Sequence, residues 1–320
     1  MLFRWIYKHL TFFLQHFILK YQDIISLISA GNNAMIVRDI LNESTKSLAA
    51  ADIPSARLDA EVLLSFCLGC DRLEFYKNPG MTISDTQLAA FRNLIARRLQ
   101  WEPVAYITGR KEFWSFSLEV NSSVLIPRPD TEIIVEEALD IYRNFTSLPV
   151  RILDIGTGSG AIALALALEI AGAEVVATDI SMAALNLAQK NAAALGLQDK
   201  IDFRQGNLFE PVDGLFDIIV SNPPYIAAND YEDLPASVRA FEPREALFAG
   251  VSGLKFYEKL IYSADGFLQK NGWLLLEIGA KQESGIRGII EGSGFYESIE
   301  MRRDYAGLPR VIRSRRKASG

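Results

Sequence analysis

Residues 222–225, with the sequence Asn-Pro-Pro-Tyr, come directly after the apolar, strand-like run around residues 216–220. Both prolines lack an N–H for a sheet ladder and fix φ, and the residue before a proline is driven towards extended backbone. A strand must therefore end here in a stiff loop. The Asn222 side chain and the Pro223 carbonyl can accept both N–H bonds of one planar NH₂ group, and the Tyr225 ring can stack on it.

Such a loop suits chemistry on a planar amine or amide nitrogen. This nitrogen is a poor nucleophile because its lone pair is delocalised, and two acceptors can turn the lone pair towards an incoming methyl group. Orientation of this kind supplies up to about 7–11 kcal/mol of a barrier in the best-oriented systems. It needs no histidine, and both histidines, His9 and His16, precede residue 35. We therefore expect no Ser-His-Asp triad and no His-ligated metal in the body of the chain.

A second group of residues predicts a nucleoside site. Glycines at alternate positions separate an apolar strand-like run, 151–155, from an apolar helix-like run, and they let the backbone come close to a ligand. Asp179 ends the next predicted strand, where a carboxylate can accept both hydroxyls of a ribose. The loop consists of Gly156, Thr157, Gly158, Ser159 and Gly160. Its spacing differs from the dinucleotide fingerprint, so NAD and S-adenosylmethionine both remain open at this point.

The loop at 222–225 decides between these two cofactors. It follows a later strand of the same predicted sheet, so it lies at the carboxyl edge where the glycine loop also lies. A methyl group on a sulfonium needs little more than an in-line approach by the oriented nitrogen. The combination therefore favours S-adenosylmethionine, without a metal.

The elements that position these residues fall into a helical part and an alternating part. Residues 35–104 have helical periodicity, with a capping box at Ser84 and Gln87, and residues 105–130 read as a β-hairpin with turns at 108–111 and 121–123. Beyond them, short strands alternate with helices, which predicts an α/β fold with a doubly wound, mostly parallel sheet. The expected divisions are 1–34, an extension; 35–104, a helical domain; 105–130, a hairpin linker; 131–313, the α/β domain; and 314–320, a basic tail.

Composition limits the function and the compartment. The net charge is −6, although residues 301–320 are basic, so the remaining body is acidic and disfavours a nucleic-acid groove. Residues 1–34 are aromatic-rich but interrupted by charges, which argues against a membrane span. We interpret them as an upstream extension, with an organellar signal as the alternative. Cys67 and Cys70 read as structural, reduced thiols, which predicts a cytoplasmic protein.

Several stretches together carry a family resemblance. The glycine loop, Asp179 and the sequence SNPPY resemble class I S-adenosylmethionine-dependent methyltransferases that act on nitrogen. Three further stretches, LIPRPDTE at 125–132, FEPREAL at 241–247 and RDYAGLPRV at 303–311, are similar to the peptide chain release factor glutamine methyltransferase family. This similarity runs from about residue 35 to about residue 311.

The resemblance implies a seven-stranded Rossmann-like methyltransferase sheet and a reaction. In that family a methyl group passes from S-adenosylmethionine to N5 of the glutamine in the Gly-Gly-Gln motif of class 1 release factors, leaving S-adenosylhomocysteine. It further implies that residues 35–104 dock the release factor. Cofactor binding then falls to Gly156–Gly160, Asp179, Asn207, Leu208 and Asn222, and substrate binding and catalysis fall to Asn222, Pro223, Pro224 and Tyr225. Asn207 and Leu208 depart from the acid or aromatic that relatives often carry beside the adenine.

Two other functions remain to be weighed. A DNA or RNA amino-methyltransferase would use the same loop on a flipped base, but it should show a basic groove. A non-catalytic nucleotide-binding protein would have no need of Asn222. Stable nucleic-acid binding and membrane association are not expected. We interpret Arg128 and Asp130 as bracing the hairpin or shaping a cofactor lid, and Glu242 and Arg244 as a surface ion pair or a closure over the substrate loop.

Overall fold

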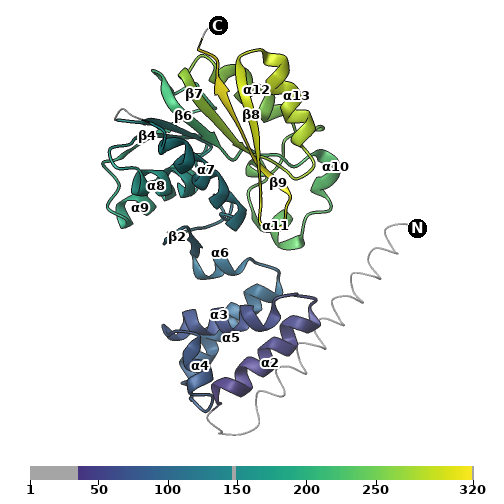
Figure 1. Ribbon diagram of the computed structural model, residues 1–320. Coiled ribbons are helices and arrows are strands. Elements are labelled where there is room, and N and C mark those ends of the chain that lie inside the picture. The colour runs from purple at the N-terminus through teal and green to yellow at the C-terminus, as the bar shows by residue number, and fades with distance from the viewer. Residues whose placement is uncertain (1–34, 146–148, 319–320) are drawn as a thin grey trace, which may run out of the picture. The chain divides into compact units, whose positions relative to one another are not determined.

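The structure, a computed structural model, describes residues 35–145 and 149–318 (Figure 1). The expectations for residues 1–34 therefore lie outside the described residues. The chain forms two compact units, and the division between them falls at Asn93 and Leu94, inside one helix. Within the described ranges, no helix is both long enough and apolar enough to cross a membrane.

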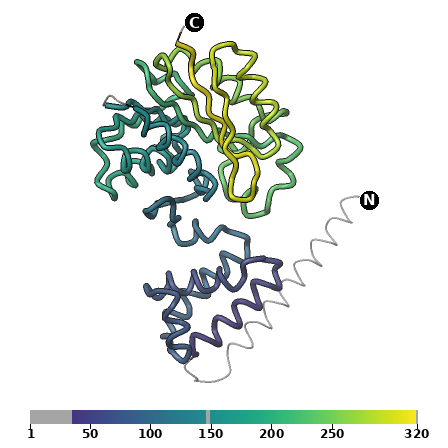
Figure 2. Tube along the Cα trace, in the orientation of Figure 1, coloured from purple at the N-terminus to yellow at the C-terminus, as the bar shows by residue number. Residues whose placement is uncertain are grey.

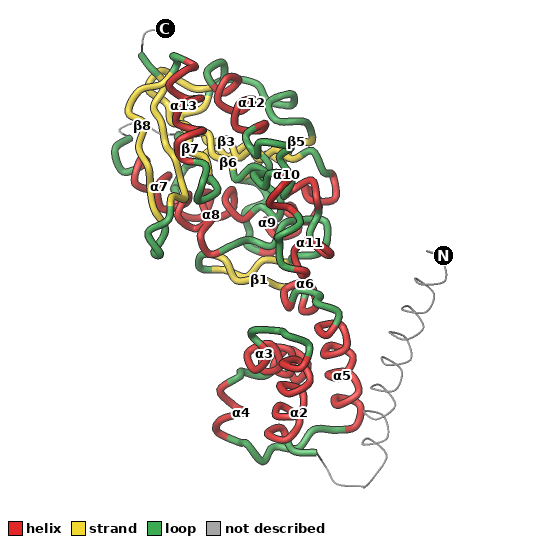
Figure 3. The backbone as a smooth tube through the Cα atoms, turned by 90° about the vertical axis from the view of Figure 1, so that its right-hand side faces the viewer, coloured by secondary structure: helices red, strands yellow, loops and turns green. Residues whose placement is uncertain are grey.

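The first unit consists of helices joined by loops (Figure 3). Apolar side chains at helical spacing, such as Ile40, Leu41 and Leu48, point into its core and are fully buried with Leu64 and Phe91. The predicted helical periodicity is therefore confirmed. The helices are α2 (Val37–Ala50), α3 (Ala56–Leu68), α4 (Leu73–Lys77) and the first part of α5 (Asp85–Leu99).

The capping box predicted at the start of α5 is present. The Gln87 backbone N–H donates to Ser84 Oγ at 3.2 Å, and the Ser84 N–H donates to Gln87 Oε1 at 3.0 Å. Two backbone donors that α5 cannot satisfy internally are paired in this way.

Replacing Ser84 by alanine should destabilise the helical unit by about 1 kcal/mol, because one of these two donors loses its acceptor. The free energy of unfolding from denaturant titrations measures the loss. Ser84→Thr keeps the hydroxyl and is the matched control. Equal stability of Ser84→Ala and the wild type would show that the box contributes nothing.

The second unit contains a seven-stranded sheet in the order β5-β4-β3-β6-β7-β9-β8. Strands β3 to β7 are parallel, and the antiparallel strands β9 and β8 close one edge, running side by side in Figure 2. The strands are β3 (Arg151–Ile155), β4 (Glu174–Asp179), β5 (Ile201–Gln205), β6 (Phe216–Ser221), β7 (Leu268–Glu277), β8 (Tyr296–Arg303) and β9 (Pro309–Arg316).

Helices cover both faces of this sheet, so the predicted doubly wound α/β fold is confirmed. Alternate residues of a strand point to opposite faces: Ile152 packs with α7, α8 and α9, whereas its neighbour Leu153 packs with α12 and α13. The helices of this unit are α6 (Val104–Thr108), η1 (Pro129–Thr131), α7 (Glu132–Tyr142), α8 (Ala161–Glu169), α9 (Met182–Ala194), α10 (Ala228–Tyr231), α11 (Ala236–Phe241), η2 (Arg244–Ala246), α12 (Lys255–Ala264) and α13 (Glu283–Ser293).

The strand order places a switch point between β3 and β6. The chain runs from β3 to β4 and β5 on one side, and then returns to place β6 on the other side of β3. The connections therefore leave in opposite directions from the carboxyl ends of these two strands, where ligands bind in open α/β sheets. The glycine loop follows β3 and the Asn-Pro-Pro-Tyr loop follows β6, so the fold brings them together.

The predicted hairpin exists, but the position predicted for its turn was wrong. β1 (Arg110–Phe113) and β2 (Phe116–Glu119) pair antiparallel, so the chain reverses at Trp114 and residue 115 and not at 108–111. Residues 104–108 instead form α6, because Pro103 suits the start of a helix and Gly109, with φ 70°, ends it. Arg110 and Lys111 then begin β1.

The expected basic tail, 314–320, begins inside the sheet. β9 extends to Arg316, and the charges of its last residues are paired: Arg315 contacts Glu297 and Arg316 contacts Asp265, each at 2.7 Å. Because both arginines have carboxylate partners, the end of β9 can remain part of the sheet despite its positive charge.

Candidate functional site

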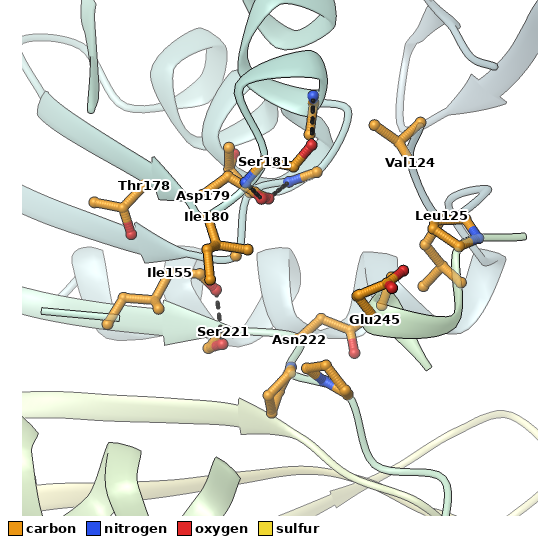
Figure 4. Close-up of a pocket in the computed structure, with 18 of the residues that line it drawn as sticks. Val124, Leu125, Ile155, Thr178, Asp179, Ile180, Ser181, Ser221, Asn222 and Glu245 are labelled. Atoms are coloured by element: carbon orange, nitrogen blue, oxygen red, sulfur yellow. Dashed lines mark hydrogen bonds between the residues drawn. The ribbon is translucent and has the colours of Figure 1, made fainter. Parts of the chain in front are cut away.

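A cavity of about 600 Å³ lies at the carboxyl ends of β3, β4, β5 and β6 (Figure 4). Its walls come from the loops after these strands and from two further segments, around residues 123–131 and 243–248. Of the predicted site residues, the cavity lining includes Gly156, Thr157, Gly158, Ser159, Asp179, Asn207, Leu208, Asn222, Pro223 and Pro224. Gly160 and Tyr225 are not part of the lining.

The glycine loop turns through backbone conformations that favour glycine. Gly156, Gly158 and Gly160 all have positive φ, between 57° and 86°. A Cβ at Gly156 or Gly158 would meet no protein atom within 4 Å, so these positions face open space in the cavity. A Cβ at Gly160 would lie 3.2 Å from that of Ala188, so this glycine allows α8 to pack closely.

Asp179 holds the glycine loop against β4. One carboxylate oxygen accepts the Gly158 N–H and the other accepts the Ser181 N–H, each at 2.9 Å (Figure 4). Burial raises the pKa of Asp179, and the backbone N–H donors oppose this effect. Each oxygen retains lone-pair capacity, so the carboxylate can still accept hydroxyl donors from a ligand in the cavity.

Asp154 supports the loop from inside the sheet and was missed by the sequence reasoning. It is fully buried near the end of β3, and the Thr157 hydroxyl donates to Asp154 Oδ2 at 2.7 Å. Burial raises the pKa of Asp154 to about 7, although the Thr157 hydrogen bond lowers it in part. The local sequence around Asp154 does not show whether a carboxylate in an apolar strand is buried or exposed, so its burial could not be predicted.

Replacing Asp154 by asparagine should make stability less dependent on pH. Because the folded-state pKa of Asp154 is raised to about 7 from 3.8, the folded protein keeps a proton that the unfolded chain releases, and stability falls as pH rises between these values. In the wild type this fall in the free energy of unfolding is on the order of a few kcal/mol, and we expect Asp154→Asn to remove it. Denaturant titrations at about pH 5 and pH 8 measure it, with the exposed Asp233→Asn as control. An unchanged difference between the two pH values would contradict this assignment.

Asn222 carries a buried acceptor with no partner. Its Nδ2 donates to Thr131 Oγ1 at 3.3 Å, whereas its Oδ1 is buried and accepts no hydrogen bond. Ser221 fixes the start of the loop, because its hydroxyl donates to the Ile155 carbonyl at 2.7 Å. Figure 4 shows Asn222 and Asp179 on different walls of the same cavity. A buried acceptor without a partner is costly, so an N–H donor entering the cavity would pair with it favourably.

Tyr225 does not lie where the sequence reasoning placed it. Its side chain packs against the α12 and α13 side of the core and against Gly279, and its backbone oxygen accepts Gln282 Nε2 at 2.9 Å. Burial raises the pKa of Tyr225 to about 12, and the charge of Glu277 adds to this effect. Stacking of this ring on a substrate amide is therefore not seen in this conformation.

Asn207 and Leu208 line the cavity after β5, as the resemblance implied for the adenine side. The Asn207 N–H and Nδ2 both donate to the Glu210 carboxylate, at 3.2 and 3.3 Å. Leu208 has a φ of 54°, so its backbone takes a left-handed turn at the cavity wall.

The expected ion pair between Glu242 and Arg244 is absent. Glu242 is buried, and it accepts Arg128 Nη2 at 2.6 Å and the Ile126 N–H at 3.1 Å. The segment before η1 is fixed beside the cavity in this way. The Arg244 guanidinium instead lies over the Phe248 ring, 4.6 Å from its centre.

The walls at 123–131 and 243–248 contain residues that were not predicted for the site. All but Ser123, Val124 and Phe248 belong to the stretches 125–132 and 241–247, and the family resemblance carried by these stretches was the only signal for them. They are Ser123, Val124, Leu125, Pro127, Thr131, Pro243, Arg244, Glu245, Ala246 and Phe248. Among the described residues, no three His, Cys, Asp or Glu side chains are grouped so as to hold a metal ion.

Two family models match different parts of the chain. A family model described as the PrmC N-terminal domain matches residues 39–109, and one described as the methyltransferase small domain matches residues 140–238. The release factor glutamine methyltransferase of Geobacter sulfurreducens is 42% identical over 280 residues, which are 87% of this chain and 96% of that protein. That of Yersinia pestis is 44% identical over 268 residues, 83% of this chain and 95% of that protein.

Solved structures show the same fold at lower identity. The hMettl16 catalytic domain, solved with the MAT2A 3'UTR hairpin 6, matches with a TM-score of 0.53 at 19% identity and covers 71% of this chain and 83% of that one. At this identity the match indicates a shared methyltransferase fold alone.

Proposed function

The chain belongs to the release factor glutamine methyltransferase family, and on this premise we propose that it methylates N5 of the glutamine in the Gly-Gly-Gln motif of class 1 release factors. The protein is a methyltransferase, and S-adenosylmethionine is the methyl donor that its fold and domain imply. The observation that carries the proposal is the unpartnered Asn222 Oδ1 at the wall of the cavity that the glycine loop and Asp179 also line.

The residues of the cavity fit the cofactor. Asp179 offers lone pairs for ribose hydroxyls, and the absence of a Cβ at Gly156 and Gly158 leaves room for a ligand close to the backbone. Asn207 and Leu208 line the cavity after β5, where the adenine would lie. When bound, S-adenosylmethionine supplies a methyl group on a sulfonium, which an amide nitrogen can attack in line.

The substrate amide meets the other wall. Asn222 Oδ1 and the Pro223 carbonyl would each accept one N–H of the glutamine NH₂, which holds the nitrogen lone pair in a fixed direction. As the new N–C bond forms, the bond from sulfur to the methyl carbon would break, and the nitrogen would release one proton to solvent water. The two acceptors act by orientation, so neither has to take this proton.

Labelled-methyl transfer tests the proposal. The purified full chain is incubated with labelled S-adenosylmethionine and a class 1 release factor, with the same factor whose Gly-Gly-Gln glutamine is replaced, and with bulk DNA and rRNA. We expect label on the intact factor alone. Label on DNA or rRNA would favour the alternative of an amino-methyltransferase acting on a base, which the family relatives do not favour. Label on the substituted factor would show that the methyl group is transferred to another residue of the release factor, which would contradict the proposed target.

We further propose that the helical unit docks the release factor and that the protein works in the cytoplasm. The family model for the N-terminal domain covers this unit, and the thiols of Cys67 and Cys70 are free. An organellar location would depend on residues 1–34, and subcellular fractionation of the full chain distinguishes the two compartments.

A further inference from the structure

Glu277 is a buried carboxylate behind the Asn-Pro-Pro-Tyr loop that the mechanism above does not use. It ends β7, next to the end of β6, and only 1% of its surface is exposed. The Thr131 hydroxyl hydrogen-bonds its carboxylate, and its Oε2 has no partner. Glu277 does not line the cavity, whereas Thr131 and Asn222 both do.

These three side chains form a relay that ends at the cavity wall. Glu277 contacts the Thr131 hydroxyl, and Thr131 Oγ1 contacts Asn222 Nδ2 at 3.3 Å. An ionised carboxylate only accepts hydrogen bonds, and a hydroxyl has one hydrogen to donate. When Glu277 is ionised, Thr131 must donate that hydrogen to Glu277, so the Thr131 oxygen can only accept from Asn222.

The direction of the relay decides which end of the Asn222 amide faces the substrate. Because Thr131 can only accept, Asn222 must turn its NH₂ towards it, and Oδ1 is then left for the cavity. The reverse orientation would present an NH₂ group to the substrate NH₂, and two donors cannot pair. The shape of the site is nearly the same in both orientations, so packing alone does not select between them.

The surroundings of Glu277 raise its pKa but leave the carboxyl group mainly ionised at about pH 8. Burial and the charge of Asp130 raise the pKa of Glu277 to about 7, while the charges of Arg310 and Arg128 lower it. Arg310 is itself held by Asp130 and Asp304, each at 3.1 Å. Burying a carboxylate costs desolvation free energy. If Glu277 only filled space, a neutral glutamine could replace it without loss of stability or activity.

We propose that Glu277, acting through Thr131, fixes the orientation of the Asn222 amide so that Oδ1 faces the substrate nitrogen. Glu277 and Thr131 are thus positioning residues for the methyl transfer. This inference rests on the proposed function and adds the group that sets the direction of the acceptor.

Glu277→Gln is the main test, because glutamine has nearly the same shape but can donate. Its NH₂ can donate to Thr131, whose hydroxyl is then free to donate to Asn222 Oδ1, which reverses the relay. At about pH 8 we expect kcat to fall by about 10²-fold, the size of effect seen when one preorganised polar group is lost. The KM for the release factor and the cofactor Kd should change by less than about threefold, and the unfolding midpoint should not fall. Glu258→Gln, at an exposed position on α12, is the matched control.

Substitutions at Thr131 separate the hydroxyl from its packing. Thr131→Ser keeps the hydroxyl and should keep kcat within a few-fold, whereas Thr131→Val removes the hydroxyl and should lower kcat as Glu277→Gln does. The double variant of Thr131→Val with Glu277→Gln should lose little more than either alone, because both break the same relay.

Exchange of the Asn222 side-chain NH₂ with solvent gives a readout that does not depend on activity. Its nitrogen-15 signal is assigned by its loss in Asn222→Ala. We expect slow exchange in the wild type, where Thr131 holds the NH₂, and faster exchange in Glu277→Gln, where the NH₂ faces the cavity.

Two results would overturn the relay: a kcat for Glu277→Gln within threefold of an active wild type, or equal NH₂ exchange in the two proteins. A parallel loss of kcat, KM and stability would also overturn it, in favour of a structural role. A wild type that methylates no release factor would instead contradict the proposed function, and NH₂ exchange would still decide the orientation of Asn222.

Discussion

Asn222→Ala is expected to lower kcat for methyl transfer by at least about 10²–10³-fold while the cofactor Kd changes by less than about threefold. Asn222 Oδ1 is a buried acceptor with no partner in the cavity, so a substrate amide gains a hydrogen bond there that alanine cannot replace. The glycine loop and Asp179 do not depend on this side chain for their hydrogen bonds.

Single-turnover methyl transfer at saturating cofactor measures the first effect, and calorimetric titration measures the second. Asn207→Ala is the matched control, because Asn207 lines the cavity after β5 and should influence cofactor affinity more than the saturated rate. Collapse of cofactor binding in Asn222→Ala would show that this residue belongs to the cofactor site and not to the grip on the amide.

Asp179→Ala should raise the cofactor Kd by about 10²-fold, because hydrogen bonds to a charged group contribute about 1.5–3 kcal/mol. The carboxylate also holds the Gly158 and Ser181 N–H groups, so its removal loosens the loop as well as removing the acceptors for the ribose. Calorimetry with S-adenosylmethionine and with S-adenosylhomocysteine gives the affinity.

Asp179→Asn separates these two contributions, since it keeps one oxygen acceptor and loses the charge. We expect a Kd between those of the wild type and Asp179→Ala. If the affinity of Asp179→Ala equals that of the wild type, Asp179 has no place in the cofactor site.

Local patterns made the sheet and the two loops at its switch point predictable. Short apolar runs in the strands, glycines after β3 and prolines after β6 are properties of neighbouring residues, so a single sequence carries them. The failure at α6 has a local cause too. The segment 104–108 is short and rich in residues that suit strands. It forms a helix because Pro103 begins it and Gly109 ends it.

The electrostatic part of the site was not predictable, because it depends on partners far away in the chain. From the sequence, the Glu242 carboxylate was interpreted as one partner of a surface ion pair with Arg244. In the fold it is buried and pairs with Arg128. Asp154 and Glu277 look like ordinary strand residues, and their burial is a property of the sheet and its helices. The direction of the Tyr225 ring follows from the core around Gly279 and from Gln282, which also lies outside any local pattern.

The hydrogen bonds that fix the cavity walls also set the order in which the protein can fold. Ile126 and Glu242 lie 116 residues apart, and Thr131 and Asn222 lie 91 apart, whereas the described part of the helical unit, 35–93, has no two residues more than 58 positions apart. Closing such long loops costs entropy before any contact repays it, so contacts of this separation form slowly. A refolding chain therefore regains its helices, and much of its circular dichroism, before it regains any affinity for its ligands.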